Sequence, residues 1–429
     1  MKKLTIENIV KIFLICNPFL DILTAFGIHM FDFPITIGII FRFIFCLVSF
    51  FYLFFLYRGK QVTKIRILLI ILISYLLSFA ILVLVLKGPE SFWYEMQGTF
   101  RSFYFLIILL LFWALVQDDK KIIPKNYLYI IYLIYLGGVF VPSLLGIGFD
   151  SYEVTKSGSI GFFNSANEIG AILSILMPLF LYYSYKKRNI LLFLLFLFIL
   201  LFVLFSIGTK GPLLSFIIIA LAFIIYCLYH LFKKKKFKQA SIIIGASLLL
   251  IIGGIYFLPK TTFYKNIRVH LDFLEVNNIS DIFKSPKLID HFIFSSRLKF
   301  LSNTADIYQE ASVSEKLLGI GYTDQNEKLK MIEMDYADIF FHHGIIGFIL
   351  YMTIYIFFLK QAIKNHLHDK DSLRKLAYFL AIFLSIILSL ITGHVLTAPA
   401  VSIFVALLLI YPKKEEQENE KKALSLHHH

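Results

Sequence analysis

The segment EMDYADIFFHHGIIGF, residues 333–348, places three carboxylates and two histidines directly against an apolar run. A helix beginning near Asp335 would put Asp335, Asp338 and His342 at positions i, i+3 and i+7, on one face. Such a stripe cannot face lipid, because a charge at the bilayer centre costs about 2.5–3.5 kcal/mol on insertion scales. We therefore expect a cavity or an external loop to receive it. The alternative is an interfacial anchor or an N-terminal cap, where the helix dipole favours carboxylates.

A second set of candidates consists of cations predicted to lie on the same side of a membrane. An outward cavity lined by such groups suits a phosphate or pyrophosphate head, because Arg binds oxyanions through two parallel hydrogen bonds and Lys as a point charge. The alternatives are snorkelling or a structural pair with Asp21 for Arg42, an ordinary turn for Lys210, and a solvated loop position for Arg297. The candidates are Arg42, Arg101, Lys210, Arg297 and Lys299.

A third candidate segment is GFFNSANEIGAIL, residues 161–173, in which Asn164, Asn167 and Glu168 lead a predicted helix. Asn164 as the N-cap and Glu168 in the first turn also have a purely structural explanation. We retain Asn167 and Glu168 as candidate substrate-binding residues. His394 and Thr397, in TGHVLTAP, are interpreted as turn residues rather than ligands.

Other chemistry has little support in the sequence. No nucleotide-binding, zinc or nucleophile-elbow pattern is present, so we expect neither a metal nor a cofactor. The three cysteines lie inside apolar runs, where they form neither a disulfide framework nor spaced metal ligands. An ATP-driven pump and a metallohydrolase are therefore not indicated.

The composition determines what must position these residues. The chain is 59% hydrophobic and 16% charged, with 47 Phe and 24 Tyr, and repeated apolar stretches approach the length of a bilayer-spanning helix. These features predict an all-α polytopic membrane protein with about twelve spans. An even number places both termini on one side. The predicted spans are 8–29, 35–57, 66–86, 100–116, 126–148, 161–184, 190–206, 211–232, 240–258, 336–359, 376–392 and 396–412.

The charges predict the topology. The formal net charge of +14 does not indicate nucleic acid, because Lys and Arg concentrate in short connections that read as cytoplasmic loops. The long loop 259–335 then faces outward, and its near-helical apolar spacing predicts short helices at the membrane surface. We expect transmembrane helices over 1–258 and 336–412 and an external loop domain between them. A cytoplasmic tail follows at 413–429, whose final HHH is typical of a purification tag.

Four features together resemble the superfamily of O-antigen ligases and O-antigen polymerases of bacterial envelopes. They are the predicted spans, the single long external loop, GFFNSANEIGAIL beside the family's G-x-x-x-x-x-N-x-x-G segment, and LLGIGY followed by EMDYADIFFHHGIIGF beside its G-x-G … H-N-x-x-L … G-I-x-G signature. Two positions depart from the ligases. Lys210 stands where ligases usually carry Arg, and Glu333 takes the place of the ligase His. The acidic residues resemble the Gram-positive polysaccharide polymerases of capsule or cell-wall pathways.

The resemblance implies a GT-C-type fold and metal-independent, inverting glycosyl transfer at the outer face of the bacterial plasma membrane. The donor would be an oligosaccharide on undecaprenyl pyrophosphate, and flippase and chain-length regulator proteins would be partners. In this interpretation Glu333 or Asp335 takes the acceptor proton, and Arg297, Lys210, Arg101 and Arg42 stabilise the leaving pyrophosphate. Residues expected to bind substrate are Arg42, Arg101, Asn167, Glu168, Lys299, Asp338 and His342.

Three alternatives stay open. A ligase would transfer the glycan once, to a wall or lipid acceptor. A transporter or flippase for lipid-linked sugars would have its site near mid-membrane, often on broken helices in two related halves. We place a peptidoglycan polymerase lower, because its external loop motifs are not evident. The concentration of polar residues at one face favours an enzyme.

Overall fold

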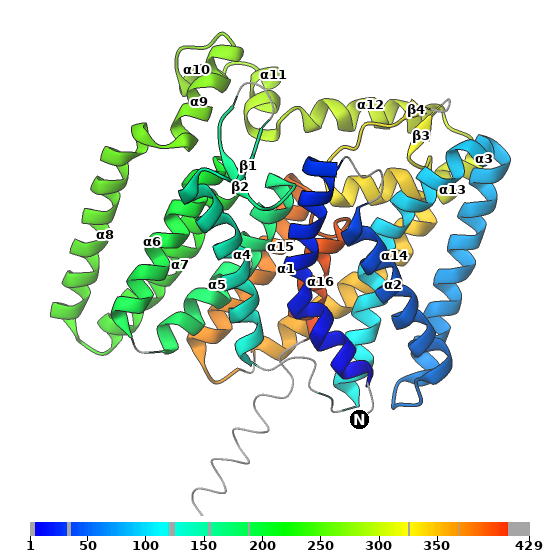
Figure 1. Ribbon diagram of the computed structural model, residues 1–429, viewed down its shortest axis with the longest axis horizontal. Coiled ribbons are helices and arrows are strands. Elements are labelled where there is room, and N and C mark those ends of the chain that lie inside the picture. The colour runs from blue at the N-terminus through cyan, green and yellow to red at the C-terminus, as the bar shows by residue number, and fades with distance from the viewer. Residues whose placement is uncertain are drawn as a thin grey trace, which may run out of the picture.

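Apolar helices running side by side form most of the chain in the computed structural model, which describes residues 5–31, 36–118, 120, 125–152, 156–187, 189–324, 327–367 and 369–410 (Figure 1). The bundle consists of α1 (Ile6–Phe31), α2 (Ile37–Phe51) with the π-helical turn η1 (Tyr52–Leu56), α3 (Val62–Gln117), α4 (Lys125–Leu145), α5 (Ala166–Lys186), α6 (Ile190–Ile207), α7 (Lys210–Lys233), α8 (Phe237–Phe257), α14 (Asp335–Leu367), α15 (Ser372–Ile391) and α16 (Pro399–Ile410).

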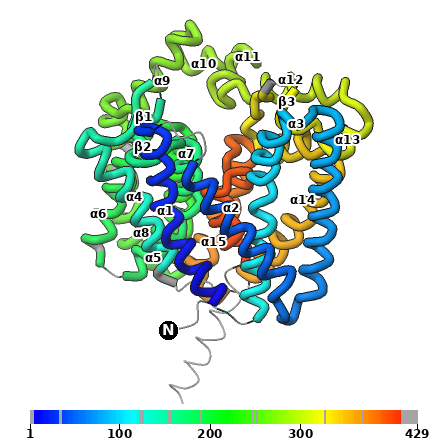
Figure 2. Tube along the Cα trace, turned by 45° about the vertical axis from the view of Figure 1, so that its right-hand side comes forward, coloured from blue at the N-terminus to red at the C-terminus, as the bar shows by residue number. Residues whose placement is uncertain are grey.

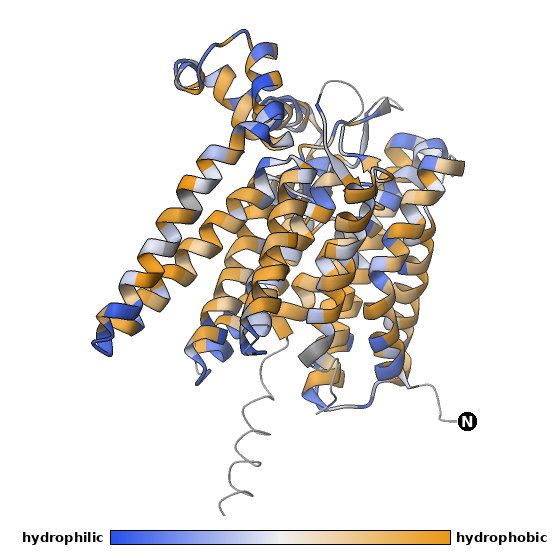
Figure 3. Cartoon of the chain, turned by 60° about the vertical axis from the view of Figure 1, so that its left-hand side comes forward, coloured by the Kyte–Doolittle hydropathy of each residue, from blue (hydrophilic) through white to orange (hydrophobic). Residues whose placement is uncertain are grey.

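The bundle has the surface of a membrane protein. In Figure 3 apolar residues cover the middle of the helices, and hydrophilic residues gather at both ends. Nine of the described helices are long and apolar enough to cross a membrane, and Leu191–Ile207 and Pro399–Ile410 are shorter apolar helices. The protein is therefore an all-α, multi-pass membrane protein, as the sequence predicts. The number of twelve spans, the GT-C fold and the side on which the termini lie stay predictions, and the tail 413–429 lies outside the described residues.

Two long helices are interrupted by glycines. In α3 the backbone of Gly88 has φ 75° and ψ 176°, directly before Pro89, and the helix then resumes at an angle. α3 thereby covers both predicted spans 66–86 and 100–116, and the connection expected between them is largely helical. In α14 Gly344 leaves the helical conformation in the same way, with φ 62°. Both breaks lie next to the polar segments described below.

One end of the bundle carries a layer of short helices, here called the loop end, which lies opposite the start of α1 (Figures 1 and 2). This layer matches the short helices predicted for the long loop. Its members are η2 (Leu258–Lys260), α9 (Thr262–Phe273), α10 (Ile279–Ile282), α11 (Pro286–Ile289), η3 (Asp290–Phe294), α12 (Arg297–Glu310) and α13 (Val313–Leu318). Two short antiparallel ribbons lie at the same end: β1 (Phe149–Asp150) with β2 (Ser159–Gly161), and β3 (Thr323–Asp324) with β4 (Glu327–Lys328).

The core lies where the second half of α3 runs through the bundle. Residues 103–115 of α3 are buried except for the partly buried Ile107, and α3 packs against α16 and α14. α5 packs against α15 and α4, and α8 stands at the edge of the bundle beside α7 (Figure 1). The polar turns that follow the break at Gly88, up to Arg101, thereby lie at the loop end.

Candidate active site at the loop end

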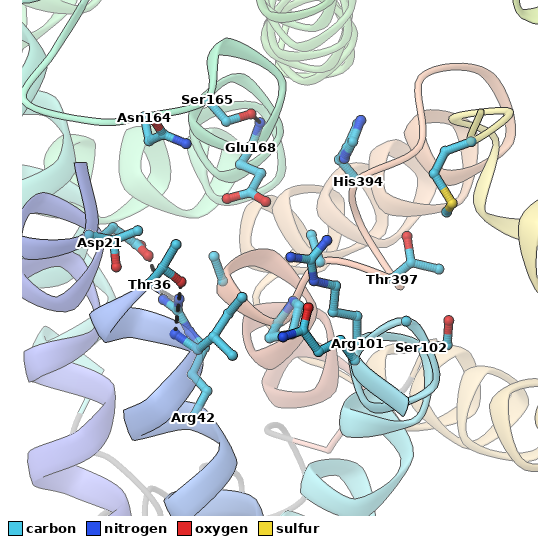
Figure 4. Close-up of a pocket in the computed structure, with 18 of the residues that line it drawn as sticks. Asp21, Thr36, Arg42, Arg101, Ser102, Asn164, Ser165, Glu168, His394 and Thr397 are labelled. Carbon is cyan, nitrogen blue, oxygen red and sulfur yellow. Dashed lines mark hydrogen bonds and ion pairs between the residues drawn. The ribbon is translucent and has the colours of Figure 1, made fainter. Parts of the chain in front are cut away.

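A cavity of about 380 Å³ opens among the helix ends below the loop layer (Figure 4). Its wall comes from segments far apart in the sequence: α1, α2, α3, α4, the start of α5, the start of α14 with the segment before it, and the turn before α16. Apolar and aromatic side chains form part of the wall, among them Ile39, Tyr94, Phe163 and Tyr322. The titratable groups on its wall are Asp21, Arg42, Arg101, Glu168, Glu333, Asp338 and His394, together with the three tyrosines Tyr94, Tyr135 and Tyr322.

Arg42 is held in the wall by a buried polar network. Its Nη2 donates to Asp21 at 2.5 Å and to Asn17 at 2.8 Å, and Tyr135 donates to the other Asp21 oxygen at 2.6 Å. Gly38 makes room for the guanidinium, because a Cβ there would lie 2.8 Å from Arg42 Nη1. The structural pair with Asp21, one of the two alternatives left open by the sequence, is therefore present, and the pair borders the cavity.

Arg101 and Glu168 face the cavity from α3 and α5. The start of α5 is fixed by Ser165, whose Oγ accepts a hydrogen bond from the backbone N of Glu168 at 3.3 Å, so Ser165 rather than Asn164 is the N-cap. In Figure 4 the Glu168 carboxylate and the Arg101 guanidinium point toward one another across the pocket. Among the described residues, neither group has an ion-pair partner.

Glu333 is held between two cations. Its Oε2 accepts a hydrogen bond from Arg297 Nη2 at 2.9 Å and lies 3.8 Å from His394 Nε2. Burial opposes ionisation of Glu333, but the hydrogen bond and charge of His394, followed by those of Arg297, lower its pKa to about 2. Burial disfavours the charged imidazolium as well, yet Glu333 raises the pKa of His394 above its ordinary value. Glu333 is thus a stable carboxylate that favours the protonated form of His394.

The backbone at this contact is strained. Glu333 has φ 62° and His394 has φ 58°, both in the left-handed region that residues with a Cβ rarely adopt. Gly393, directly before His394, packs against the backbone carbonyl of Glu333, and a Cβ at Gly393 would lie 2.5 Å from that oxygen. Strained residues of this kind concentrate at functional sites.

The acidic stripe of α14 builds the frame around Glu333. α14 begins at Asp335, as the sequence predicts. The two oxygens of Asp338 accept hydrogen bonds from the backbone N of Ile332 at 3.0 Å and of Met334 at 3.1 Å, on either side of Glu333. Asp338 borders the cavity, and each of its two oxygens already accepts one backbone amide hydrogen bond.

Asp335 and His342 do not line the cavity, although His342 Nε2 lies 3.5 Å from Asp338 Oδ1. Asp335 is completely buried and accepts from the backbone N of Leu396 at 2.8 Å and from Thr397 Oγ1 at 2.6 Å, so it fixes the turn that carries His394. The Nδ1–H of His342 donates to the Gly321 carbonyl at 2.5 Å. The predicted common face therefore serves several backbone segments, and of its three residues Asp338 alone lines the cavity.

The GIGY segment, residues 319–322, packs against the GIIG segment, residues 344–347, at the break in α14. Ile320 N donates to the Phe341 carbonyl at 3.0 Å, and Gly321 N donates to the His342 carbonyl at 3.2 Å. A Cβ on Gly344 would lie 2.5 Å from Gly319 N, so the close approach requires glycine. This crossing holds Tyr322, whose ring borders the cavity.

Tyr322 and its neighbours are tied to the second half of α3. The Tyr322 hydroxyl lies 2.8 Å from both Ser102 Oγ and His343 Nε2. Glu95, which is completely buried, accepts from the backbone N of Tyr322 and Thr323 at 2.8 and 2.9 Å and pairs with Lys87 at 2.7 Å. The loop end and the break in α3 thus form one packed unit.

Comparison with known proteins assigns the family. Residues 3–287 and 277–413 match the family described as O-antigen ligase like membrane protein, which covers most of the chain. The chain belongs to this family. A search of curated proteins gave no match. This O-antigen ligase-like protein is therefore a membrane enzyme of O-antigen or polysaccharide assembly.

In this O-antigen ligase-like protein two of the predicted catalytic cations lie outside the cavity wall. Lys210, the first residue of α7, donates from Nζ to the Phe292 carbonyl and lies over the Phe292 ring, 3.5 Å from its centroid. Its Nζ also lies 3.5 Å from His270 Nδ1, and burial lowers the pKa of His270 to about 4. Arg297 reaches the cavity only through Glu333.

α12 orients Arg297 from its first residue. The Asp290 carboxylate accepts from the backbone N of Leu298 at 2.9 Å and of Lys299 at 3.1 Å, and so caps the helix. The side chains of Lys299 and Asn167, both predicted to bind substrate, are exposed and do not line the cavity.

Several wall residues did not stand out in the sequence. His394 and Thr397 do lie in a turn, as interpreted, but that turn borders the cavity. Tyr94, Gln97 and Met331 carry no motif of their own. The one available signal was the polar YEMQ stretch ahead of Arg101, at a place where a membrane span was expected to begin. No group of three or more His, Cys, Asp or Glu side chains suited to a metal ion occurs in the described part of the chain.

Proposed function

We propose that this protein is an inverting glycosyltransferase that polymerises lipid-linked oligosaccharide repeat units at the loop end. The donor is a glycan on a polyprenyl diphosphate such as undecaprenyl pyrophosphate, and the acceptor is a hydroxyl group of another repeat unit. Family membership supports glycan transfer at a membrane, and the position of the cavity at the helix ends suits a substrate with a lipid tail in the bilayer and a polar head outside it.

The observation that carries the proposal is the guanidinium of Arg101, which faces the cavity and has no carboxylate partner among the described residues. Arg42 stands in the same wall but shares its charge with Asp21. A diphosphate leaving group gathers negative charge as its bond to the sugar breaks, and a guanidinium aimed at that charge stabilises the transition state. Tyr94, which is only partly buried in this wall, offers an apolar ring to a sugar.

The choice of polymerase over ligase rests on Glu333. Ligases of the resembling superfamily carry His at this position, whereas here an ionised carboxylate is bound by Arg297 and His394. An acidic group at this position makes the site electrostatically different from a ligase site. This difference favours a different acceptor, and we therefore propose a polymerase.

The test uses the purified full-length chain in lipid nanodiscs with a polyprenyl-diphosphate-linked saccharide. The expected products are a ladder of longer glycans and free polyprenyl diphosphate. A single transfer onto a non-saccharide acceptor would instead identify a ligase. Movement of the donor across a vesicle membrane without any product would identify a flippase and overturn the proposal.

A further inference from the structure

The four carboxylates on the cavity wall differ in what already binds them. Asp21 accepts from a guanidinium and a phenol, Asp338 accepts from two backbone amides, and Glu333 is held by Arg297. Hydrogen bonds and cations that stabilise the ionised form make a carboxylate a weaker base. Glu333, which lies outside the membrane-spanning helices, is an example, because its pKa is lowered to about 2. These three are poorly suited to take a proton from a hydroxyl group.

Glu168 is different. In the ranges that the structure describes, no group donates a hydrogen bond to its carboxylate, and no Lys, Arg or His lies within ion-pair distance of it. Its backbone is nevertheless fixed, because its N donates to Ser165 Oγ at the start of α5. Figure 4 shows the carboxylate directed into the pocket. Glu168 is therefore a positioned carboxylate with unused lone pairs.

Arg101 completes the arrangement from the opposite wall. Its guanidinium and the Glu168 carboxylate point toward each other across the pocket, yet no ion pair joins them (Figure 4). The two groups carry opposite charges and leave space between them, in a cavity of about 380 Å³. A molecule with a diphosphate on one side and a hydroxyl group on the other fits between such walls.

We infer that Glu168 is the general base of the reaction, which rests on the proposed glycosyl transfer. The Glu168 carboxylate takes the proton of the acceptor hydroxyl as that oxygen forms a bond to the anomeric carbon of the donor. The bond from this carbon to the diphosphate oxygen breaks, and its electron pair leaves with the diphosphate, next to Arg101. The protonated Glu168 then gives the proton to water, which restores the carboxylate.

In this arrangement Glu333 is a positioning residue. It holds His394 at the edge of the cavity, and Arg297 in turn holds Glu333. Asp335 acts on the same turn from behind through Leu396 and Thr397. The carboxylates of the 333–338 segment thus shape the cavity, whereas the proton of the acceptor hydroxyl goes to Glu168 on the opposite wall.

The decisive variant is Glu168→Gln, which keeps the shape of the side chain but removes the base. General bases contribute about 10²–10⁴-fold to turnover, so kcat should fall at least about 100-fold. The KM for the donor and donor binding, measured by stabilisation of the protein against heat, should stay close to those of the unaltered protein. Glu90→Gln is the matched control, because Glu90 is an exposed carboxylate that lines neither the cavity nor the contacts around it.

The outcomes separate the two proposals. If the unaltered protein transfers no glycan, the proposed function fails. If it does transfer glycan and Glu168→Gln keeps kcat within about threefold, Glu168 is not the base. Loss of donor binding in Glu168→Gln would make it a substrate-binding residue and would also overturn the inference.

Glu168→Asp provides a second test if the Gln variant does not fold. Withdrawing the carboxylate by one methylene should lower kcat while the acid limb of the pH–rate profile is retained. An unchanged kcat in this variant would count against the role of Glu168.

Discussion

Arg297 Nη2 donates to Glu333 Oε2 at 2.9 Å, and this hydrogen bond joins the first residue of α12 to the segment that leads into α14. The side chain of Arg297 is 7% exposed, whereas that of Glu333 is 28% exposed, so the cation is the more deeply buried partner. The contact links the loop layer to the membrane bundle at the edge of the cavity.

Removing the charge of Glu333 should destabilise the protein. In Glu333→Gln the buried guanidinium of Arg297 loses its counter-charge, and the expected loss is about 1–3 kcal/mol in the free energy of unfolding. The double variant Arg297→Met with Glu333→Gln should lose less than the sum of the two single variants. Unfolding of all four proteins in the same detergent measures the coupling, and strictly additive losses would show that the contact contributes nothing.

Stability should depend on pH through Glu333 and His394. The pKa of Glu333 is lowered from 4.5 to about 2, so its contribution is complete above about 4.5 and is lost as the pH falls toward 2. The pKa of His394 is raised from 6.5, so its contribution is complete below 6.5 and is lost as the pH rises through the higher value. The melting temperature should therefore be highest between about pH 4.5 and 6.5. His394→Gln should flatten the alkaline decline, and an unchanged decline would contradict this assignment.

Gly344 should not tolerate a side chain. It has φ 62°, and an added Cβ would lie 2.5 Å from Gly319 N and 2.6 Å from the Leu317 carbonyl. Gly344→Ala should lower stability by at least about 1–3 kcal/mol from the backbone conformation alone. Gly253→Ala in α8 is the control, since a Cβ there meets nothing within 4 Å. Equal melting temperatures for the two variants would rule out the crossing described above.

Arg101 should govern donor affinity. Hydrogen bonds to charged groups are worth about 1.5–3 kcal/mol, so Arg101→Ala should raise the Kd of the lipid diphosphate about 10- to 100-fold. Arg101→Lys should recover part of this, because it keeps the charge but loses the two-fold hydrogen bonding. Arg268→Ala removes an exposed guanidinium of the loop layer and should leave the Kd unchanged. Similar Kd values for Arg101→Ala and Arg268→Ala would exclude this role.

Much of the bundle could be predicted because the length of an apolar stretch and the residues that begin a helix are properties of the local sequence. The start at Asp335 was expected, and so were the short helices of the long loop. The helical stretch between 87 and 99 was not expected. Its polar residues look like a connection, yet Glu95 is completely buried and binds the backbone of Tyr322 and Thr323, more than 220 residues away.

The site was harder to predict than the fold because its charges are partnered over long distances. Three residues on one face of α14 suggested one common target, but Asp335 binds the segment before α16, whereas His342 binds Gly321 and lies 3.5 Å from Asp338. Lys210 likewise finds its partner at Phe292. The spacing of residues along a helix predicts which face of the helix their side chains share. It does not predict which loop packs on that face, and that loop supplies the partner.

The crossing of Gly319–Gly321 with the break in α14 divides the long loop into two parts with different freedom to change. Residues 258–312 are surface helices tied to the bundle through a few side chains, among them Asn266, which binds the backbone of Ser157 and Gly208, and Arg297, which binds Glu333. Residues 319–323 instead supply amides to the carbonyls of Phe341 and His342, and unpaired carbonyls are costly near a bilayer. A chimera that keeps residues 319–323 together with Asn266 and Arg297 can therefore carry a foreign sequence elsewhere in the loop and still retain the cavity beneath it.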